Sequence, residues 1–86
     1  MAKYSIELKR SAAEEIEAVA NKTKRQQIVS RIGKRAEDPR PPGCQKLSGQ
    51  AAYRVRQGEY RIIYTIEDDW LVVIVVKVGH RRDVYR

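Results

Sequence analysis

The most apolar run of the chain is Trp70-Leu71-Val72-Val73-Ile74-Val75-Val76-Lys77-Val78. Apolar side chains occupy consecutive positions here, whereas a strand with one face in water would alternate them with polar ones. We therefore expect residues 70–78 to form a strand that is covered on both faces and lies inside a sheet. The run is too short to span a bilayer, so we expect no membrane segment.

Two segments before this run, at about 51–57 and 59–66, alternate apolar and polar residues as half-buried strands do. Gly58 separates them, and an acidic cluster at 67–69 separates the second from the apolar run. Glycine and short polar clusters between such segments mark tight turns. The C-terminal half therefore predicts three strands in an antiparallel meander.

The N-terminal part predicts one more strand and a helix. Residues 3–9 alternate apolar and polar side chains, which indicates a half-buried strand. Ser11 followed by Glu14 has the spacing of a capping box, in which each side chain bonds the backbone of the other residue. The sequence therefore predicts a helix over 12–20.

A second helix should follow, with Thr23 and Gln26 as a weaker cap. Its expected apolar stripe, at helical spacing, consists of Ile28, Ile32 and Ala36, with Val29 beside them. The proline-rich segment 39–43 cannot continue a helix and predicts a loop. The predicted order is β-α-α-β-β-β, an α+β fold in which a two-helix hairpin packs on one sheet.

Size and charge limit the possible functions. The chain has 86 residues and a formal net charge of +7, which favours an anionic partner such as nucleic acid. We expect residues 1–86 to form one small domain. One Cys and one His exclude an internal disulfide and a zinc site made by this chain alone. We expect no cofactor, and a cytoplasmic location because no signal peptide is evident.

Three arginines should share one face of the predicted sheet. Arg54 and Arg56 alternate with apolar residues and therefore point away from the apolar face. A two-residue turn at 57–58 would place Arg54 opposite Arg61, and a turn at 58–59 would place Arg56 there. Either register gathers the three guanidinium groups on one face.

Like charges directly opposite each other destabilise a hairpin, so a chain that keeps them suggests an anion that offsets the repulsion. The alternative is a solvated face on which Glu59 pairs with one arginine.

The segment after the last strand is Gly79-His80-Arg81-Arg82-Asp83-Val84-Tyr85-Arg86. Antiparallel pairing of 70–78 with 59–66 would bring this segment to the end of the sheet where Arg61 lies. Histidine changes charge near neutral pH, and arginine binds phosphate through two parallel N–H donors. Tyrosine offers either a ring on which another ring can stack or a hydroxyl that can donate a proton. These groups are the parts of a site that breaks a phosphodiester without a metal ion.

RNA carries its own nucleophile, the 2′-hydroxyl. Its cleavage needs a base for that proton, a donor for the departing 5′-oxygen and cations for the crowded phosphorane. Arginine stays protonated, so His80 or Tyr85 must move the protons while the arginines stabilise charge. We expect a metal-independent reaction, because no cluster of acidic residues accompanies the arginines.

Four segments carry a likeness to a known family: Lys46-Leu47-Ser48-Gly49, Tyr53-Arg54-Val55-Arg56, Gly58-Glu59-Tyr60-Arg61-Ile62-Ile63-Tyr64 and Val78-Gly79-His80-Arg81-Arg82-Asp83-Val84-Tyr85. In this order they resemble the RelE family of the RelE/ParE superfamily of toxins, over nearly the whole chain. The resemblance implies a toxin that enters the ribosomal A site and cuts mRNA, leaving a 2′,3′-cyclic phosphate and a 5′-hydroxyl. It also implies a cognate antitoxin that wraps and blocks the toxin, with oligomers formed only through that complex.

The resemblance further implies roles for individual residues, among them stacking of Tyr85 on a base. The residues expected at the reacting phosphate are Arg61, Arg81, His80 and Tyr85. The residues expected to bind RNA phosphates are Arg54, Arg56, Arg82 and Lys46. Relatives carry lysines at the positions of Arg54 and Arg56, where one can act as a base, so arginines here shift that role to His80.

Two other functions use the same fold. One is a ParE-like protein that inhibits DNA gyrase without nuclease chemistry, and the other is an inactive or merely basic RNA-binding module. The fold alone does not separate them. The His-Arg-Arg-x-x-Tyr tail argues against the gyrase inhibitor, because binding to gyrase needs no such cleavage site.

Overall fold

The computed structural model describes residues 3–47, 49 and 51–80 of the chain. The strands are β1 (Ser5–Leu8), β2 (Gln45–Lys46), β3 (Ala52–Gln57), β4 (Tyr60–Glu67) and β5 (Val72–His80). The helices are α1 (Arg10–Glu17), α2 (Lys22–Gly33) and the short 3-10 helix η1 (Lys34–Ala36). The predicted α+β class and element order are confirmed, and β2 is an additional short strand that the sequence did not indicate.

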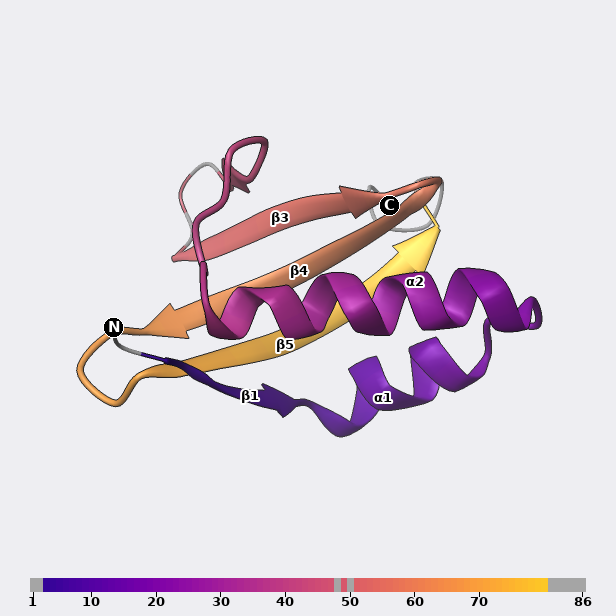
Figure 1. Cartoon of the computed structure of the whole chain (residues 1–86), viewed down its shortest axis with the longest axis horizontal. Coiled ribbons are helices and arrows are strands. Elements are labelled where there is room, and N and C mark those ends of the chain that lie inside the picture. The colour runs from indigo at the N-terminus through magenta and orange to yellow at the C-terminus, as the bar shows by residue number, and fades with distance from the viewer. Residues whose placement is uncertain (1–2, 48, 50, 81–86) are drawn as a thin grey trace.

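The strands form one sheet in the order β1-β5-β4-β3-β2, with the two helices on one face (Figure 1). β5 pairs in parallel with β1 and antiparallel with β4, so its apolar run lies inside the sheet as predicted. Its fully buried residues face the helices: Val73, Val75 and Val78. Its other face is only partly buried, at Val72 and Ile74, because the helices cover one side alone. The expectation that both faces of this strand would be covered was therefore wrong.

The core lies between the sheet and the helices. Its largest fully buried side chains are Tyr64, Ile28, Ile62, Val55, Val73, Val75 and Val78. Each buried aliphatic side chain of this size stabilises the fold by about 1.5–3 kcal/mol. Since side chains alternate along a strand, a core residue at one position sends its neighbours to the opposite face of the sheet.

Both predicted helix caps were wrong. Lys9 donates its N–H to Val75 O at 2.9 Å, so β1 leads directly into α1 and Ser11 falls inside the first turn. The N-cap of α2 is Asn21, whose side-chain oxygen accepts the N–H of Lys24 at 3.0 Å. Neither α1 nor α2, the α-helices of the described residues, has the length and apolarity needed to cross a membrane.

The β4–β5 turn is fixed by a cluster of polar side chains around Asp68. The Tyr4 hydroxyl donates to Asp68 Oδ1 at 2.7 Å, and Arg40 donates to both carboxylate oxygens at 3.2 and 2.8 Å. Arg40 Nε also donates to the Tyr53 hydroxyl at 3.2 Å. This Asp68 cluster therefore links the residue before β1, the loop before β2, strand β3 and the β4–β5 turn.

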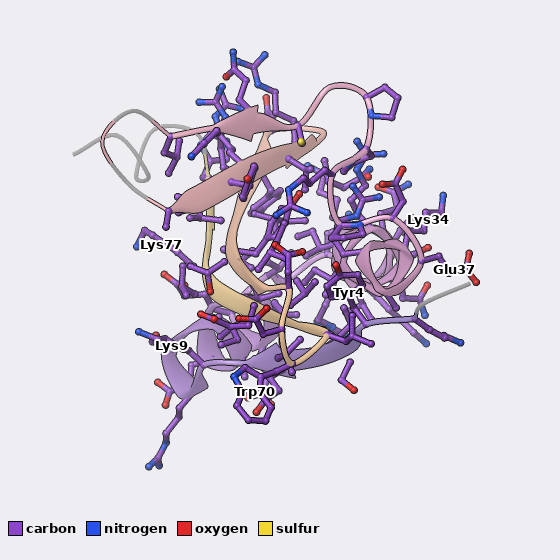
Figure 2. The ribbon with its side chains drawn as sticks, turned by 90° about the vertical axis from the view of Figure 1, so that its left-hand side faces the viewer. Tyr4, Lys9, Lys34, Glu37, Trp70 and Lys77 are labelled. Carbon is purple, nitrogen blue, oxygen red and sulfur yellow. The ribbon has the colours of Figure 1, made fainter. Side chains whose placement is uncertain are left out.

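Trp70 projects from the same turn and is 80% exposed (Figure 2). The next residue, Leu71, has a φ of 54°, a value that belongs to a turn and not to a strand. β5 therefore begins at Val72, two residues later than the apolar run suggested.

The Asp68 cluster predicts how stability depends on pH. The hydrogen bond from Arg40 lowers the pKa of the Asp68 carboxyl, and the bond from Tyr4 lowers it further. A carboxyl with a lowered folded-state pKa stabilises the fold above its unfolded value of about 3.9, and this contribution is lost as pH falls through the folded pKa.

Asp68→Asn should therefore lower the melting temperature at pH 7, and the difference from wild type should shrink as pH falls below the unfolded value and through the lowered folded-state pKa of Asp68. The cluster is exposed, so added salt should also reduce the difference. Thermal unfolding followed by circular dichroism measures both effects. Asp69→Asn, which changes the neighbouring exposed carboxylate, is the matched control. A difference that stays constant with pH would contradict this account.

Candidate functional site

The predicted arginine face is present. Arg56 of β3 lies directly opposite Arg61 of β4, and Arg54 lies opposite Ile63. The hairpin therefore turns at Gly58 and Glu59, one of the two registers that the sequence allowed. Gly58 has a φ of 61°, a conformation that favours glycine. Because side chains alternate along both strands, the three arginines share the sheet face opposite the helices.

The arginine face, which we define as Arg54, Arg56 and Arg61, is more than a solvated surface. Arg54 and Arg61 are each only 8% exposed, whereas Arg56 is exposed. Arg54 Nη2 donates to Gln45 Oε1 of β2. Burial lowers the pKa of Arg54, and the positive charge of Arg56 lowers it further. Positive charge is therefore concentrated on a partly dehydrated surface, where an anion would be bound strongly.

His80 lies at the same end of the sheet. It is the last residue of β5 and pairs across the sheet with Tyr60, one position beyond the pairing of Gly79 with Arg61. The imidazole packs edge-on against the Tyr60 ring, with 5.8 Å between ring centroids. Its Nε2 lies 3.1 Å from Glu59 Oε2 in the β3–β4 turn. The end of β5 and this turn lie side by side in Figure 1.

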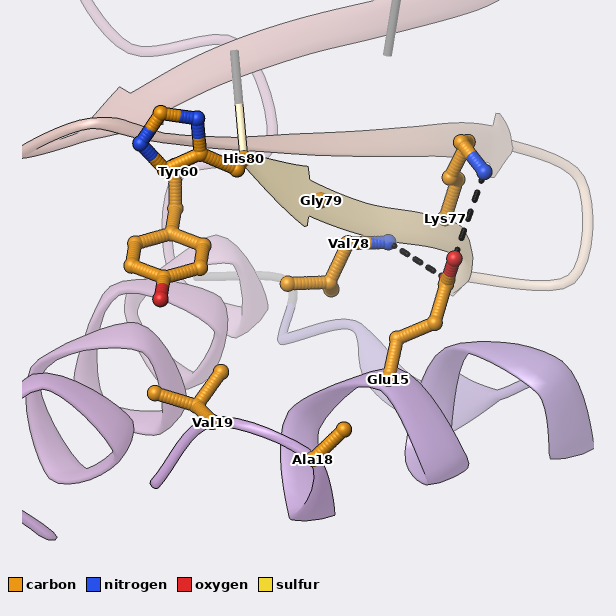
Figure 3. A pocket seen from close by; sticks show the side chains of 8 residues that line it. All are labelled: Glu15, Ala18, Val19, Tyr60, Lys77, Val78, Gly79 and His80. Atoms are coloured by element: carbon orange, nitrogen blue, oxygen red, sulfur yellow. Dashed lines mark hydrogen bonds and ion pairs between the residues drawn. The ribbon is translucent and has the colours of Figure 1, made fainter. Parts of the chain in front are cut away.

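His80 and the arginine face do not occupy the same side of the sheet. Tyr60, the cross-strand partner of His80, belongs to the side that faces the helices, and its ring points toward them in Figure 3. The described part of the site therefore wraps around the end of the sheet, with guanidinium groups on one side and the imidazole at the tip. A substrate that reaches both must cross that end.

A pocket of about 260 Å³ opens beside His80, between the end of α1 and the end of β5 (Figure 3). β1 stops opposite Val75, so the edge of β5 beyond that point is not paired by β1. Glu15 of α1 accepts the Val78 N–H at 3.0 Å and pairs with Lys77 at 3.2 Å. This carboxylate satisfies a backbone donor that a neighbouring strand would otherwise bind.

The remaining predicted site residues are placed differently. Lys46 of β2 lies opposite Tyr53, so alternation puts it on the other side of the sheet from Arg54. The predicted residues that lie outside the described part of the chain are Arg81, Arg82 and Tyr85. Within residues 3–47, 49 and 51–80, no three His, Cys, Asp or Glu side chains are grouped so that they could hold a metal ion.

Sequence reasoning missed three contacts of this region. Glu59 was expected, at most, to pair with an arginine, but it contacts His80. The contacts of Gln45 with Arg54 and of Glu15 with Val78 were not foreseen. The only signal in the sequence was the position of Glu59 immediately before Tyr60 and Arg61, within the predicted turn.

Comparisons with known proteins agree with this fold. A family model described as "ParE toxin of type II toxin-antitoxin system, parDE" matches residues 6–85. Toxin RelG of Mycobacterium tuberculosis is 38% identical over 45 residues, which are 52% of this chain and 49% of RelG. The match thus spans about half the length of this curated relative.

Solved structures of RelE proteins resemble the chain along most of its length. The isolated E. coli RelE toxin has a TM-score of 0.78 at 29% identity, covering 95% of this chain and 90% of that chain. A chain of the archaeal RelE–RelB complex from Pyrococcus horikoshii has a TM-score of 0.82 at 21% identity, covering 96% and 99%. The archaeal likeness shows the fold alone.

The fold and the family match define the class, a small toxin with two helices on a five-stranded sheet. The chain belongs to the ParE toxin family of type II toxin–antitoxin systems, within the RelE/ParE superfamily.

Crowding on the arginine face predicts opposite effects on stability and binding. Arg56→Gln should stabilise the fold by about 0.2–1 kcal/mol, because like charges directly opposite each other destabilise a hairpin. The same change should weaken binding of single-stranded RNA and lower the slope of log affinity against log salt by about 0.7. Urea unfolding and fluorescence anisotropy at several salt concentrations measure the two effects.

Lys9→Gln removes the same charge from an exposed site at the start of α1 and is the matched control. It should leave the salt dependence unchanged. Loss of stability in Arg56→Gln together with unaltered RNA binding would show that this face does not bind phosphate.

Proposed function

We propose that this toxin is a ribosome-dependent endoribonuclease that cleaves mRNA in the A site by metal-independent attack of the 2′-hydroxyl. The observation that carries the proposal is the pairing of Arg56 with Arg61 on a partly buried face, at the end of the sheet where His80 lies. Guanidinium groups bind phosphate through paired N–H donors, and histidine exchanges protons near neutral pH.

The proposed reaction couples two proton transfers to the exchange of one bond at phosphorus. His80 takes the proton of the 2′-hydroxyl, and the 2′-oxygen forms a bond to phosphorus. The bond between phosphorus and the 5′-oxygen breaks, and a second group protonates that oxygen. The products are a 2′,3′-cyclic phosphate and a 5′-hydroxyl. Arg61 and Arg56 stabilise the additional negative charge of the phosphorane.

Arg81 and Tyr85 complete the proposed site, as the family resemblance implies. Arg81 is assigned to the transition state and leaving group, and Tyr85 to stacking on a base. Arg82, Arg54 and Lys46 are assigned to neighbouring phosphates, with Lys46 as the most distant contact because it lies on the other side of the sheet.

The proposed partners are the ribosome, mRNA and a cognate antitoxin. The matched RelE structures include toxin–antitoxin complexes from E. coli and Pyrococcus horikoshii, which supports an antitoxin that binds this toxin as well. Oligomers would form only through that complex. Translating ribosomes are cytoplasmic, so the proposed function places the toxin in the cytoplasm.

A second candidate function is inhibition of DNA gyrase. The matching family model describes ParE toxins, which favours this alternative. The arginine face and His80 favour the nuclease, because binding to a protein target requires no group for proton transfer.

Incubation with translating ribosomes and a defined message tests the proposal. The wild-type toxin should cut the message, leaving a cyclic phosphate and a 5′-hydroxyl, and a single 2′-deoxynucleotide at the cut site should abolish cleavage. Arg61→Ala should reduce the rate by about 100-fold or more, since it removes charge stabilisation in the transition state. Arg10→Ala, at an exposed arginine of α1, is the control. Gyrase-dependent DNA breaks without RNA cleavage would establish the alternative.

The role of His80 makes a separate prediction. His80→Gln should lower kcat by about 10²–10⁴-fold, the usual contribution of general base catalysis, and change KM much less. Single-turnover cleavage on programmed ribosomes measures both constants. An unchanged rate in a folded His80→Gln variant would exclude His80 as the base.

A further inference from the structure

The turn that joins the two arginine-bearing strands also carries a carboxylate next to the imidazole. Glu59 is the second residue of that turn, and its Oε2 lies 3.1 Å from His80 Nε2. We propose that Glu59 is a positioning residue that fixes the tautomer and orientation of His80. This inference rests on the nuclease function proposed above.

The hydrogen bond determines which imidazole nitrogen can act as a base. An ionised carboxylate only accepts hydrogen bonds, so His80 Nε2 must carry the hydrogen in this contact. In neutral imidazole one nitrogen is a donor and the other an acceptor. Glu59 therefore favours the tautomer in which Nδ1 is the acceptor, and Nδ1 is the atom that takes the 2′-hydroxyl proton.

Two contacts from adjacent residues hold the ring. Glu59 binds its Nε2, and the Tyr60 ring packs edge-on against it at 5.8 Å between centroids. Tyr60 is also the cross-strand partner of His80 (Figure 3). Because Glu59 is the last residue of the β3–β4 turn and Tyr60 is the first residue of β4, the hairpin that pairs Arg56 with Arg61 also orients the imidazole.

Glu59 should affect the reaction more than the fold. Once Nδ1 has taken the proton, the imidazolium carries a positive charge beside the Glu59 carboxylate, which stabilises it. A carboxylate that orients a catalytic histidine in this way contributes to kcat. The contact is largely exposed, with side-chain exposures of 31% for His80 and 65% for Glu59. An exposed ion pair adds little to stability.

The experiment compares Glu59→Ala, which removes the acceptor, with Glu59→Gln, which keeps an oxygen acceptor but removes the charge. Glu67→Ala, at an exposed carboxylate at the other end of β4, is the matched control. Single-turnover cleavage on programmed ribosomes gives kcat and KM. Nitrogen-15 chemical shifts of the single histidine report its tautomer in the toxin without RNA or ribosomes.

We expect Glu59→Ala to lower kcat by about 10-fold or more with little change in KM, a smaller loss than that of His80→Gln. Glu59→Gln should fall between wild type and Glu59→Ala. The nitrogen-15 shifts should show the hydrogen mainly on Nε2 in wild type and in Glu59→Gln, and redistribute in Glu59→Ala. Glu67→Ala should match wild type in every measurement.

Equal kcat values for Glu59→Ala and wild type would overturn the inference, as would identical nitrogen-15 shifts. An equal loss in Glu67→Ala would do so too, because the effect would then be general electrostatics. Failure of the nuclease proposal is distinguishable: the wild type would not cleave RNA, while the shifts would still show whether Glu59 sets the tautomer.

Discussion

Arg56 faces Arg61 across the β3–β4 hairpin, in one of the two registers that keep aliphatic residues in the core and the three arginines on the opposite face. Val55 and Ile62 pair across the same hairpin and are fully buried against the helices. A shift of one residue would turn these side chains to the opposite face and place the arginines in the core. Burial of aliphatic residues on one side therefore forces cations together on the other side. The rest of the proposed site follows from that pairing.

The same hairpin also sets the positions of side chains other than the arginines. Its turn presents Glu59, and the first residue of β4, Tyr60, pairs with His80 at the end of β5. The opposite end of the sheet carries the Asp68 cluster, in which opposite charges meet and stabilise the turn. The two ends of the sheet thus differ in electrostatics. At the β4–β5 turn, the charge of Asp68 is neutralised by Arg40. Near the β3–β4 turn, the arginines concentrate positive charge that a phosphate can offset.

The sequence was sufficient for features that depend on local patterns. The apolar run predicted β5 inside the sheet, and alternation predicted the arginine face in either register. Contacts between distant residues could not be predicted, because they depend on how elements pack: the bonds of Arg40 with Asp68 join residues 28 positions apart. The start of α1 was missed because the pairing of β1 with β5, which includes the bond from Lys9 N–H to Val75 O, decides where the helix begins. The start of α2 was missed because Asn21, and not Thr23, is the N-cap residue and accepts the Lys24 N–H. The position of His80 at the end of the sheet could not be predicted either, because it depends on the register in which β5 pairs with β4.

We propose that one phosphodiester is bound across the end of the sheet, by the arginine face on one side and His80 at the tip. Nuclear magnetic resonance of the arginine Nε and histidine ring signals, during titration with a 2′-deoxy-substituted RNA trinucleotide that cannot be cleaved, tests it most directly. Saturable shifts of Arg56, Arg61 and His80 with the same affinity, and none at exposed Arg10 of α1, are the expected result. Shifts confined to arginines of α1 and α2, with Arg56 and Arg61 unchanged, would contradict it.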